Sequence, residues 1–304
     1  MLKIIFLGTA GSFPTPRRSP SCIFVNREGD LFLFDCGEGA QRQMMIAKCG
    51  IMRISSIFIT HFHADHILGI PGLIQTLSFN GREEPLTVYG PVGVEEFVEL
   101  FISLGRVRLG FDLLPVEVSG GDTIAREGYS VSVFNTVHGV PSVGYALVED
   151  ERPGRFDRER AVSLGVPPGP LFRRLHRGES VEIDGRIVTS EEVVGKPRRG
   201  RKIVYTGDTR PTEETIKAAL GADLLIHDAS MADDLSDWAR QTGHSTAGEA
   251  ARVASEAGVG QLVLTHVSAR YSENTDVLLD DARRIFGNTL VAYDLMELTV
   301  PYPE

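Results

Sequence analysis

Four apolar segments of this chain are each followed by a residue that can bind a metal ion. The four residues are His61, His138, Asp208 and His266. Each preceding segment has the length and the β-branched or aromatic content of a buried strand. If the strands lie in sheets whose carboxyl ends face one way, the four residues meet at one rim, where open α/β proteins bind ligands. The pattern therefore predicts an α/β fold with a metal site at one end of its sheets.

The densest part of this pattern is His-Phe-His-Ala-Asp-His at residues 61–66. His61 and His63 are two residues apart in extended backbone and can point the same way, whereas Asp65 and His66 follow where the chain turns toward a helix. Imidazole and carboxylate ligands suit zinc, which takes four ligands in most protein sites. Two such pairs need further ligands, and the candidates are His138, Asp208 and His266.

The remaining pattern alternates strands and helices, which predicts two layers of sheet flanked by helices. The expected strands are residues 3–7, 22–25, 31–34, 56–60, 87–89, 130–134, 202–206, 223–227, 261–265 and 289–292. The expected helices are residues 38–47, 71–78, 94–104, 212–220, 246–257 and 274–286.

Charge is distributed unevenly along the chain. The net charge is −10, yet residues 152–202 hold 13 Lys and Arg against 7 Asp and Glu, a net of +6. Pro and Gly residues occur throughout this basic insert, which is either a solvated surface excursion or an arm that binds a polyanion.

The 3 cysteines form no C-x-x-C pair, and no apolar run approaches the roughly 18 residues of a membrane span. We therefore expect a cytoplasmic protein with no membrane partner.

The candidate ligands resemble those of the metallo-β-lactamase superfamily over nearly the whole chain. The resemblance implies an αββα sandwich that binds two Zn²⁺ per subunit. It implies that one ion is held by His61, His63 and His138, the other by Asp65, His66 and His266, and that Asp208 bridges them.

Other motifs are similar to those of a narrower family, ribonuclease Z, the zinc endonucleases that remove 3′ trailers from precursor tRNA. The motifs are Gly-Val-Pro-Pro-Gly-Pro at residues 165–170, His-Val-Ser-Ala-Arg-Tyr at 266–271 and Ala-Tyr-Asp-Leu at 292–295. The resemblance implies one metallo-β-lactamase domain over residues 1–304, with an inserted flexible arm at residues 149–202 that binds tRNA. It also implies a homodimer.

Two family motifs are altered in this chain. In the loop at residues 14–19 the family's Lys is replaced by Pro16 and its Asn by Ser19, which affects recognition near the cleavage site. In the second motif Asp228 stands in place of Glu, so its carboxylate is one methylene closer to the backbone.

The resemblance implies a mechanism in which a zinc-bound hydroxide, oriented by Asp65, attacks the phosphorus in line. His244, supported by Asp228, then protonates the leaving 3′ oxygen, so the tRNA keeps a 3′-hydroxyl and the trailer a 5′-phosphate. The alternative for His244 is that it caps the helix near residue 246 or fills space. Phosphate contacts are expected from the arm arginines Arg173, Arg174, Arg177, Arg198, Arg199 and Arg201. Arg270 is a further phosphate candidate or part of a surface ion pair.

Two other functions are compatible with the same ligands. The chain could be another hydrolase of this fold that cleaves a small phosphodiester, ester or lactone, because the ligands alone do not select the bond. It could also be a zinc-dependent RNA-binding protein that has lost activity, although a pure binder has no need of both metal positions.

Overall fold

The computed structural model describes residues 1–104 and 108–303. The chain forms two compact units, of which the first combines Met1–Val148 with Arg201–Tyr302 and the second consists mainly of Glu149–Gly200. Within the described ranges, no helix is both long enough and apolar enough to cross a membrane.

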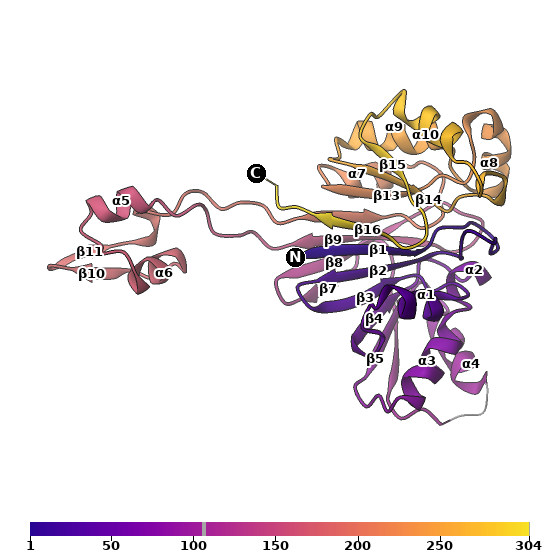
Figure 1. The fold of residues 1–304 in the computed structure, drawn as a ribbon, viewed down its shortest axis with the longest axis horizontal. Helices are drawn as coiled ribbons and strands as arrows, with labels where there is room; N and C mark the ends of the chain where they lie inside the picture. Colours follow the sequence, from indigo (N-terminus) through magenta and orange to yellow (C-terminus); the bar gives the residue numbers. More distant parts are fainter. Residues whose placement is uncertain (105–107, 304) are drawn as a thin grey trace. The chain divides into compact units, whose positions relative to one another are not determined.

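The first unit contains two seven-stranded sheets, shown in Figure 1. One has the order β16-β1-β2-β3-β4-β5-β6 and the other the order β15-β14-β13-β12-β9-β8-β7. The strands of the first sheet are β1 (Leu2–Gly8), β2 (Cys22–Arg27), β3 (Asp30–Phe34), β4 (Ile54–Phe58), β5 (Leu86–Gly90), β6 (Leu113–Glu117) and β16 (Met296–Val300). Those of the second are β7 (Thr123–Arg126), β8 (Tyr129–Asn135), β9 (Val143–Glu149), β12 (Lys202–Tyr205), β13 (Leu224–Asp228), β14 (Leu262–Thr265) and β15 (Thr289–Val291).

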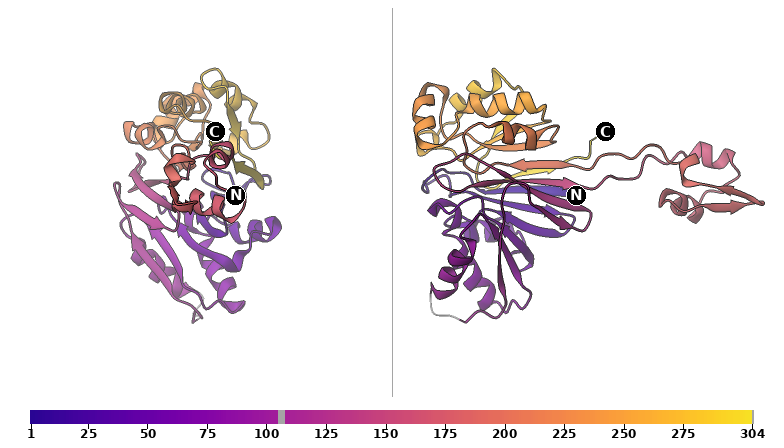
Figure 2. Two further views of the ribbon diagram at one scale, coloured as in Figure 1. Left: turned by 90° about the vertical axis from the view of Figure 1, so that its left-hand side faces the viewer. Right: turned by 180° about the vertical axis from the view of Figure 1, so that it is seen from behind.

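Helices cover the outer faces of both sheets, as the views in Figures 1 and 2 show. The first sheet is covered by α1 (Ala40–Ala47), α3 (Ile70–Phe79) and α4 (Val94–Ser103), with the short α2 (Ala64–Ile67) at its rim. The second is covered by α7 (Glu213–Ala219), α9 (Ala247–Ala257) and α10 (Asp276–Arg283), and α8 (Ser236–Thr242) precedes α9. Short 3₁₀ turns are η1 (Ile51–Arg53), η4 (Asp233–Leu235) and η5 (Ala269–Tyr271).

Alternation of side chains along the strands builds three apolar layers. In β1, Leu2, Ile4 and Phe6 pack between the two sheets, whereas Ile5 and Leu7 pack toward the helices. Successive side chains of a strand point to opposite faces, so a strand that is apolar throughout must be covered on both sides. The result is an αββα sandwich, which confirms the fold predicted from the sequence.

The rim that carries the candidate ligands is set by parallel strands. β3, β4, β5 and β6 run parallel in the first sheet, and β12, β13, β14 and β15 run parallel in the second. Their carboxyl ends therefore lie at one edge of each sheet.

The second unit has a small apolar core of its own. It contains α5 (Arg158–Ser163), α6 (Pro170–His176), the hairpin of β10 (Val181–Ile183) with β11 (Arg186–Val188), and the turn η3 (Ser190–Glu192). Its buried side chains are Ala161, Val166, Leu175, Val181, Val188 and Val193. The basic insert therefore forms a folded unit of its own.

Several elements were not predicted. β6, β7 and β16 lie at sheet edges and expose about every other residue, and β6 also contains Pro115, which argues against a strand. The expected strand at 56–60 begins and ends two residues earlier, at Ile54–Phe58. The expected helix at 274–286 is limited to Asp276–Arg283.

Candidate active site

The structure brings the seven candidate ligands together at the rim of the first unit. His61 follows β4, His138 follows β8, Asp208 follows β12, and His266 follows β14. Asp65 and His66 lie in α2, which begins directly after His63. Side chains from both sheets therefore meet, as the strand pattern predicted.

One group of four ligand atoms comes from His61, His63, His138 and Asp208, and all four lie within 4.8 Å of one another. His63 Nδ1 is 3.0 Å from His61 Nε2 and 3.2 Å from His138 Nε2. Asp208 Oδ2 is 3.7 Å from His61 Nε2 and 3.8 Å from His138 Nε2. Three imidazoles and a carboxylate at this spacing form a set that one divalent ion can take as ligands.

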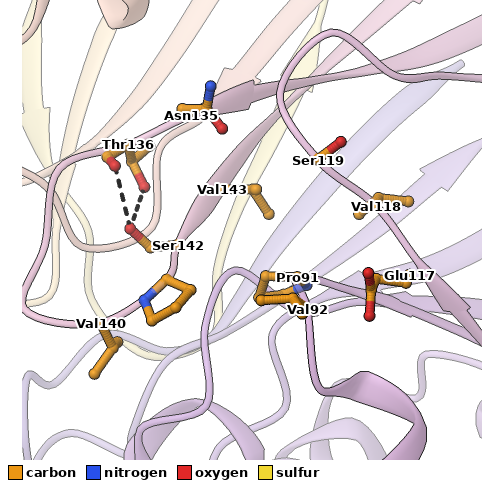
Figure 3. A pocket seen from close by; sticks show the side chains of 11 residues that line it. Pro91, Val92, Glu117, Val118, Ser119, Asn135, Thr136, Val140, Ser142 and Val143 are labelled. Carbon is orange, nitrogen blue, oxygen red and sulfur yellow. Dashed lines mark hydrogen bonds between the residues drawn. The ribbon is translucent and has the colours of Figure 1, made fainter.

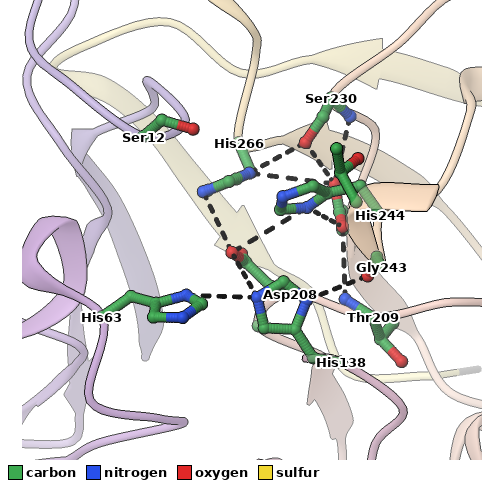
Figure 4. A network of polar contacts seen from close by, with 12 residues as sticks. Ser12, His63, His138, Asp208, Thr209, Ser230, Gly243, His244 and His266 are labelled. Carbon is green, nitrogen blue, oxygen red and sulfur yellow. Dashed lines mark hydrogen bonds and ion pairs between the residues drawn. The ribbon is translucent and has the colours of Figure 1, made fainter. Parts of the chain in front are cut away.

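A second group shares Asp208 with the first. It comprises Asp65, His66, Asp208 and His266. His266 Nε2 lies 3.2 Å from both Asp65 Oδ2 and Asp208 Oδ2, and His66 Nε2 lies 3.4 Å from Asp208 Oδ1. Figure 4 shows Asp208 between the imidazoles of His138 and His266. Asp208 is thus the one residue common to both groups.

Four imidazoles are held through the ring nitrogen that faces away from the cluster. The contacts are His61 Nδ1 to Thr60 Oγ1 at 3.1 Å, His66 Nδ1 to Asp35 Oδ2 at 2.7 Å, His138 Nδ1 to Gly243 O at 2.9 Å and His266 Nδ1 to Ser230 Oγ at 2.8 Å. Such outer contacts fix the tautomer and the orientation of a ligand imidazole. In each ring the Nε2 atom is therefore directed to the cluster.

Asp35 is a functional residue that the sequence reasoning missed. It is fully buried and accepts hydrogen bonds from Thr60 N at 2.8 Å, Tyr205 Oη at 2.7 Å and the His66 ring. It follows β3 directly, so the rule of an apolar strand followed by a polar ligand would have found it. Among the described contacts of its carboxylate, the one ligand imidazole is that of His66, which it serves to orient.

Two buried atoms of the cluster test whether a metal ion fits. His66 Nε2 and Asp208 Oδ1 are buried and make no hydrogen bond with a described residue, although they face each other as an ion pair at 3.4 Å. Buried polar atoms without a hydrogen bond are costly, by roughly 1–3 kcal/mol each. Burial also lowers the pKa of His61 and of His63, which favours neutral imidazoles there, whereas at His66 the carboxylates of Asp208 and Asp35 outweigh burial and raise the pKa. The donor set of imidazole and carboxylate therefore fits a divalent ion such as zinc.

Asp208 is ionised despite its burial. Burial alone would raise its pKa, but the neighbouring His266 and His66 hold the pKa well below the usual range. A carboxylate shared by the two groups supplies the negative charge that two cations require.

His244, whose side chain is 12% exposed, and Asp228, which is fully buried, form a pair beside the ligands. His244 Nδ1 donates to Asp228 Oδ2 at 2.9 Å, and Ser230 donates to Asp228 Oδ1 through both N and Oγ. Burial acts to lower the pKa of His244, but Asp228 outweighs it and raises the pKa to about 9. Thr246 caps α9 instead, through its side chain and Glu249 N. The alternative that His244 is the helix cap is therefore wrong.

Arg210 supports the loop that carries His244, and the sequence reasoning did not single it out. Its guanidinium donates to His244 O and pairs with both carboxylate oxygens of Glu249. Its backbone N donates to Val137 O at 2.8 Å, next to His138. Arg210 thus ties the segment that precedes a ligand to the segment that carries His244.

The loop at residues 9–19 lies against the second ligand group. Ser12 N donates to Asp65 Oδ2 at 2.8 Å, and a Cβ added to Gly11 would lie 2.8 Å from the His266 ring. Ser19 N donates to Asp294 Oδ2 at 2.7 Å. Because Ser19 makes this contact through its backbone, the replacement of the family's Asn leaves the contact intact.

The arginines expected to contact phosphate differ in exposure. Arg173, Arg174, Arg177 and Arg199 are exposed in the second unit, Arg198 is half-buried there, and Arg270 is exposed in the first unit. Arg201 is 2% exposed, donates to Val300 O and lies 3.8 Å from the Tyr302 ring centre. The expectation that Arg201 contacts phosphate is therefore wrong, because its guanidinium is enclosed in the first unit.

Comparison with protein families finds two partial matches. Residues 2–100 match the family described as anti-Pycsar protein Apyc1, and residues 176–267 match the beta-lactamase superfamily domain.

Full-length relatives give a more specific result. Ribonuclease Z of Methanosarcina acetivorans is 58% identical over 99% of this chain and 99% of its own length, and that of Archaeoglobus fulgidus is 50% identical over 100% and 99%. The crystal structure of the short form of human tRNase Z has a TM-score of 0.72 and 28% identity, and the match covers 98% of this chain and 99% of the human one.

The αββα sandwich with a His and Asp cluster at its rim defines a hydrolase of the metallo-β-lactamase fold, suited to a divalent metal. Within this class the full-length relatives identify one family. The chain belongs to the ribonuclease Z family.

Proposed function

We propose that this protein is a zinc-dependent endoribonuclease that removes the 3′ trailer from precursor tRNA. It leaves a 3′-hydroxyl on the tRNA and a 5′-phosphate on the trailer. The observation that carries the proposal is the hydrogen-bonded His244–Asp228 pair directly beside a cluster of seven metal-ligand candidates. Such a pair can supply a proton to a leaving oxygen, and the relatives named ribonuclease Z support RNA as the substrate.

The metal assignment follows the two ligand groups. One Zn²⁺ would be held by His61, His63 and His138, a second by Asp65, His66 and His266, and Asp208 would bridge the two. When bound, the ions supply positive charge to the scissile phosphate and lower the pKa of an attacking water. Imidazole-rich sites favour zinc over magnesium, which prefers oxygen ligands.

Asp65 is suited to act on the attacking water. Its Oδ2 atom accepts from Ser12 N at 2.8 Å and lies 3.2 Å from His266 Nε2, so the carboxylate is fixed at the cluster. From this position it orients the water and takes a proton from it as the new P–O bond forms.

His244 completes the proton balance. Its Nδ1 donates to Asp228, so Nε2 is the ring atom left to act on substrate. As the P–O3′ bond breaks, Nε2 gives its proton to the leaving 3′ oxygen. Asp228 holds the ring in place and stabilises its protonated form, so it is a positioning residue. The stacking of His244 on His266, with ring centres 5.0 Å apart, sets the distance of the ring from the cluster.

The second unit is proposed to bind the body of the tRNA. An A-form helix is recognised through its phosphates and 2′-hydroxyls, and exposed arginines on a separate folded unit suit that task. The contacts proposed are from Arg173, Arg174, Arg177, Arg198 and Arg199, with Arg270 near the ligands of the first unit. We also propose, from the family resemblance, that the enzyme is a cytoplasmic homodimer.

One assay tests the function directly. Precursor tRNA labelled at its 5′ end is incubated with the protein, with and without a chelator, and the cut is mapped to single-nucleotide resolution. We expect one cut at the 3′ end of the tRNA body, which chelation abolishes and added Zn²⁺ restores. Cleavage of a small phosphodiester without cleavage of precursor tRNA would instead support the small-substrate alternative.

A further inference from the structure

Thr60 lies between β4 and His61 and is fully buried. Its backbone N–H donates to Asp35 Oδ1 at 2.8 Å. Its hydroxyl oxygen lies 2.9 Å from Asp35 Oδ2 and 3.1 Å from His61 Nδ1. Asp35 in turn holds His66, a ligand of the second group. One buried threonine therefore joins the carboxylate that orients a ligand of the second group to a ligand of the first.

The hydroxyl of Thr60 has one proton and two neighbours that can accept it. Asp35 is surrounded by donors, because Thr60 N, Tyr205 Oη at 2.7 Å and the His66 ring all bond to its carboxylate. A carboxylate in such a setting accepts a further hydrogen bond, so the hydroxyl donates to Asp35. The hydroxyl oxygen is then left to accept from His61, whose Nδ1 carries the proton.

This arrangement decides which nitrogen of His61 presents a lone pair to the cluster. A neutral imidazole carries its proton on one nitrogen and binds metal through the other. With the proton on Nδ1, the Nε2 atom of His61 is free to act as a ligand in the first group. In the other tautomer a proton on Nε2 would block it. Asp35 therefore acts on His66 directly and on His61 through Thr60.

Thr60 is also held from the second sheet. Val143 N donates to Thr60 O at 2.9 Å, and a Cβ added to Gly207 would lie 2.7 Å from the Thr60 side chain. Figure 3 shows Val143 in the wall of a pocket of about 310 Å³. In the same wall Thr136 Oγ1 donates to Ser142 Oγ at 2.8 Å and closes the loop that leads into β9. Contacts with both sheets therefore fix the position of the Thr60 hydroxyl.

We propose that Thr60 is a positioning residue that sets the tautomer of His61, so that one carboxylate, Asp35, orients a ligand of each metal position. The inference rests on the proposed assignment of two metal ions, and it predicts an asymmetry. Removal of the Thr60 hydroxyl should weaken only the ion that His61 holds. Removal of the Asp35 carboxylate should weaken both ions.

Metal binding measures this asymmetry without any substrate. The protein is freed of metal with a chelator and titrated with Co²⁺, whose visible absorption reports its ligands, and with Zn²⁺ in a calorimeter. We expect the wild-type protein to bind two ions. In Thr60→Val one of the two should bind about 10- to 100-fold more weakly, the usual effect of losing an outer contact of a ligand, and in Asp35→Asn both should.

Two single-position backgrounds identify the ion that is weakened. His138→Ala disables the first group and leaves the second, whereas His266→Ala disables the second and leaves the first. When added to His266→Ala, Thr60→Val should weaken the remaining ion about 10- to 100-fold. When added to His138→Ala, the same substitution should leave the affinity of the remaining ion unchanged.

Matched variants separate the hydroxyl from its packing. Thr60→Ser keeps the hydroxyl and should bind both ions as the wild type does, because it loses only the methyl group beside Gly207. Thr215→Val makes the same change at a second fully buried threonine, in α7, whose hydroxyl bonds to Thr212 Oγ1 at 2.9 Å. It should leave the affinity for both ions unchanged.

Nitrogen-15 NMR of the metal-free protein reads the tautomer itself. We expect the His61 proton on Nδ1 in the wild type and in Thr60→Ser, and a shift toward Nε2 in Thr60→Val. This measurement on the wild type needs no variant, so a His61 proton on Nε2 would overturn the inference even if Thr60→Val did not fold.

The metal titrations distinguish failure of this inference from failure of the proposed function. Unchanged affinity of Thr60→Val in the His266→Ala background would overturn the role of Thr60, as would equal weakening by Thr60→Ser. Equal weakening by Thr60→Val in both backgrounds would indicate a general structural effect and would overturn it too. Wild-type protein that binds fewer than two ions would instead refute the proposed metal assignment.

Discussion

The ligand rim of the first unit and the arginines of the second unit are built in opposite ways. At the rim most of the ligand groups are buried and held by named partners, as His66 is by Asp35, and His244, whose side chain is 12% exposed, is held by Asp228. In the second unit Arg173 and Arg177 are exposed, and Arg174 pairs with Glu179 in a surface contact. A buried group with a unique position cannot be replaced by a neighbour, whereas exposed cations of equal charge can share a task. Single substitutions should therefore reduce activity strongly at the rim and only slightly in the arm.

The largest effect is expected from Asp208→Ala, because it removes the ligand common to both groups. We expect kcat/KM to fall at least about 10³-fold, for precursor tRNA and for a small phosphodiester alike, because the charge supplied by bound metal is lost. Bound zinc, measured by atomic absorption, should fall with it. The control is Glu213→Ala on α7, whose side chain is 89% exposed. Full zinc content with lost activity would contradict a ligand role.

His244→Asn should slow the cleavage of RNA almost as much, but it should not slow the cleavage of every substrate. We expect kcat for precursor tRNA to fall about 10²- to 10⁴-fold, the usual value of a general acid, with zinc content unchanged. A phosphodiester with a 4-nitrophenol leaving group needs no proton and should be cleaved at close to the wild-type rate. If both substrates are slowed equally, His244 is not the proton donor.

Removing the whole arm should reduce activity by an intermediate amount, and only the activity on RNA. Arg152 and Arg198 exchange backbone hydrogen bonds of 2.8 and 2.9 Å, so an Asn-Gly turn can replace residues 153–197. We expect KM for precursor tRNA to rise about 10- to 100-fold and its salt dependence to weaken, because phosphate contacts are lost. Hydrolysis of a small phosphodiester should be unchanged. A parallel loss of both activities would make the arm structural.

Arg210→Gln should lower the rate by about tenfold, because the His244 loop loses its tie to Glu249 and the proton donor is less well placed. The loss should appear in kcat for precursor tRNA and not in the activated 4-nitrophenyl substrate, and Arg210→Lys should restore part of it. Arg252→Gln, an exposed position on α9, is the control. A loss on both substrates would indicate a general structural role.

The smallest effect is expected from one arm arginine. Arg174→Ala removes a side chain that is 53% exposed and pairs with Glu179, a contact worth at most about 1 kcal/mol of folding free energy. We expect precursor tRNA to bind about threefold more weakly. The number of counterions released on binding, obtained from the salt dependence of the affinity, should fall by about one. A loss as large as that of the arm deletion would mean that the arm contains a unique contact and would break the comparison with the rim.

Much of the rim was predictable because it obeys a local rule. An apolar run followed by His or Asp marks a buried strand and the residue at its carboxyl end, and this identified His61, His138, Asp208 and His266 without knowledge of strand order. The same rule covers Asp35, which follows β3 as Asp208 follows β12 and which the sequence analysis did not single out. Arg210 had no such signal, because its partners Glu249 and His244 are 39 and 34 residues away.

By itself, the sequence determined the strand periodicity, the apolar layers, the ligand types and the concentration of basic residues in one insert, because these depend on residues near one another in the chain. Tertiary structure alone decided which ligand atoms share Asp208 and that Arg201 is enclosed rather than available to phosphate. Such properties depend on contacts between distant segments and on strand order. The physical reason is that burial and distance belong to the packed molecule, whereas periodicity and charge are already present in the chain.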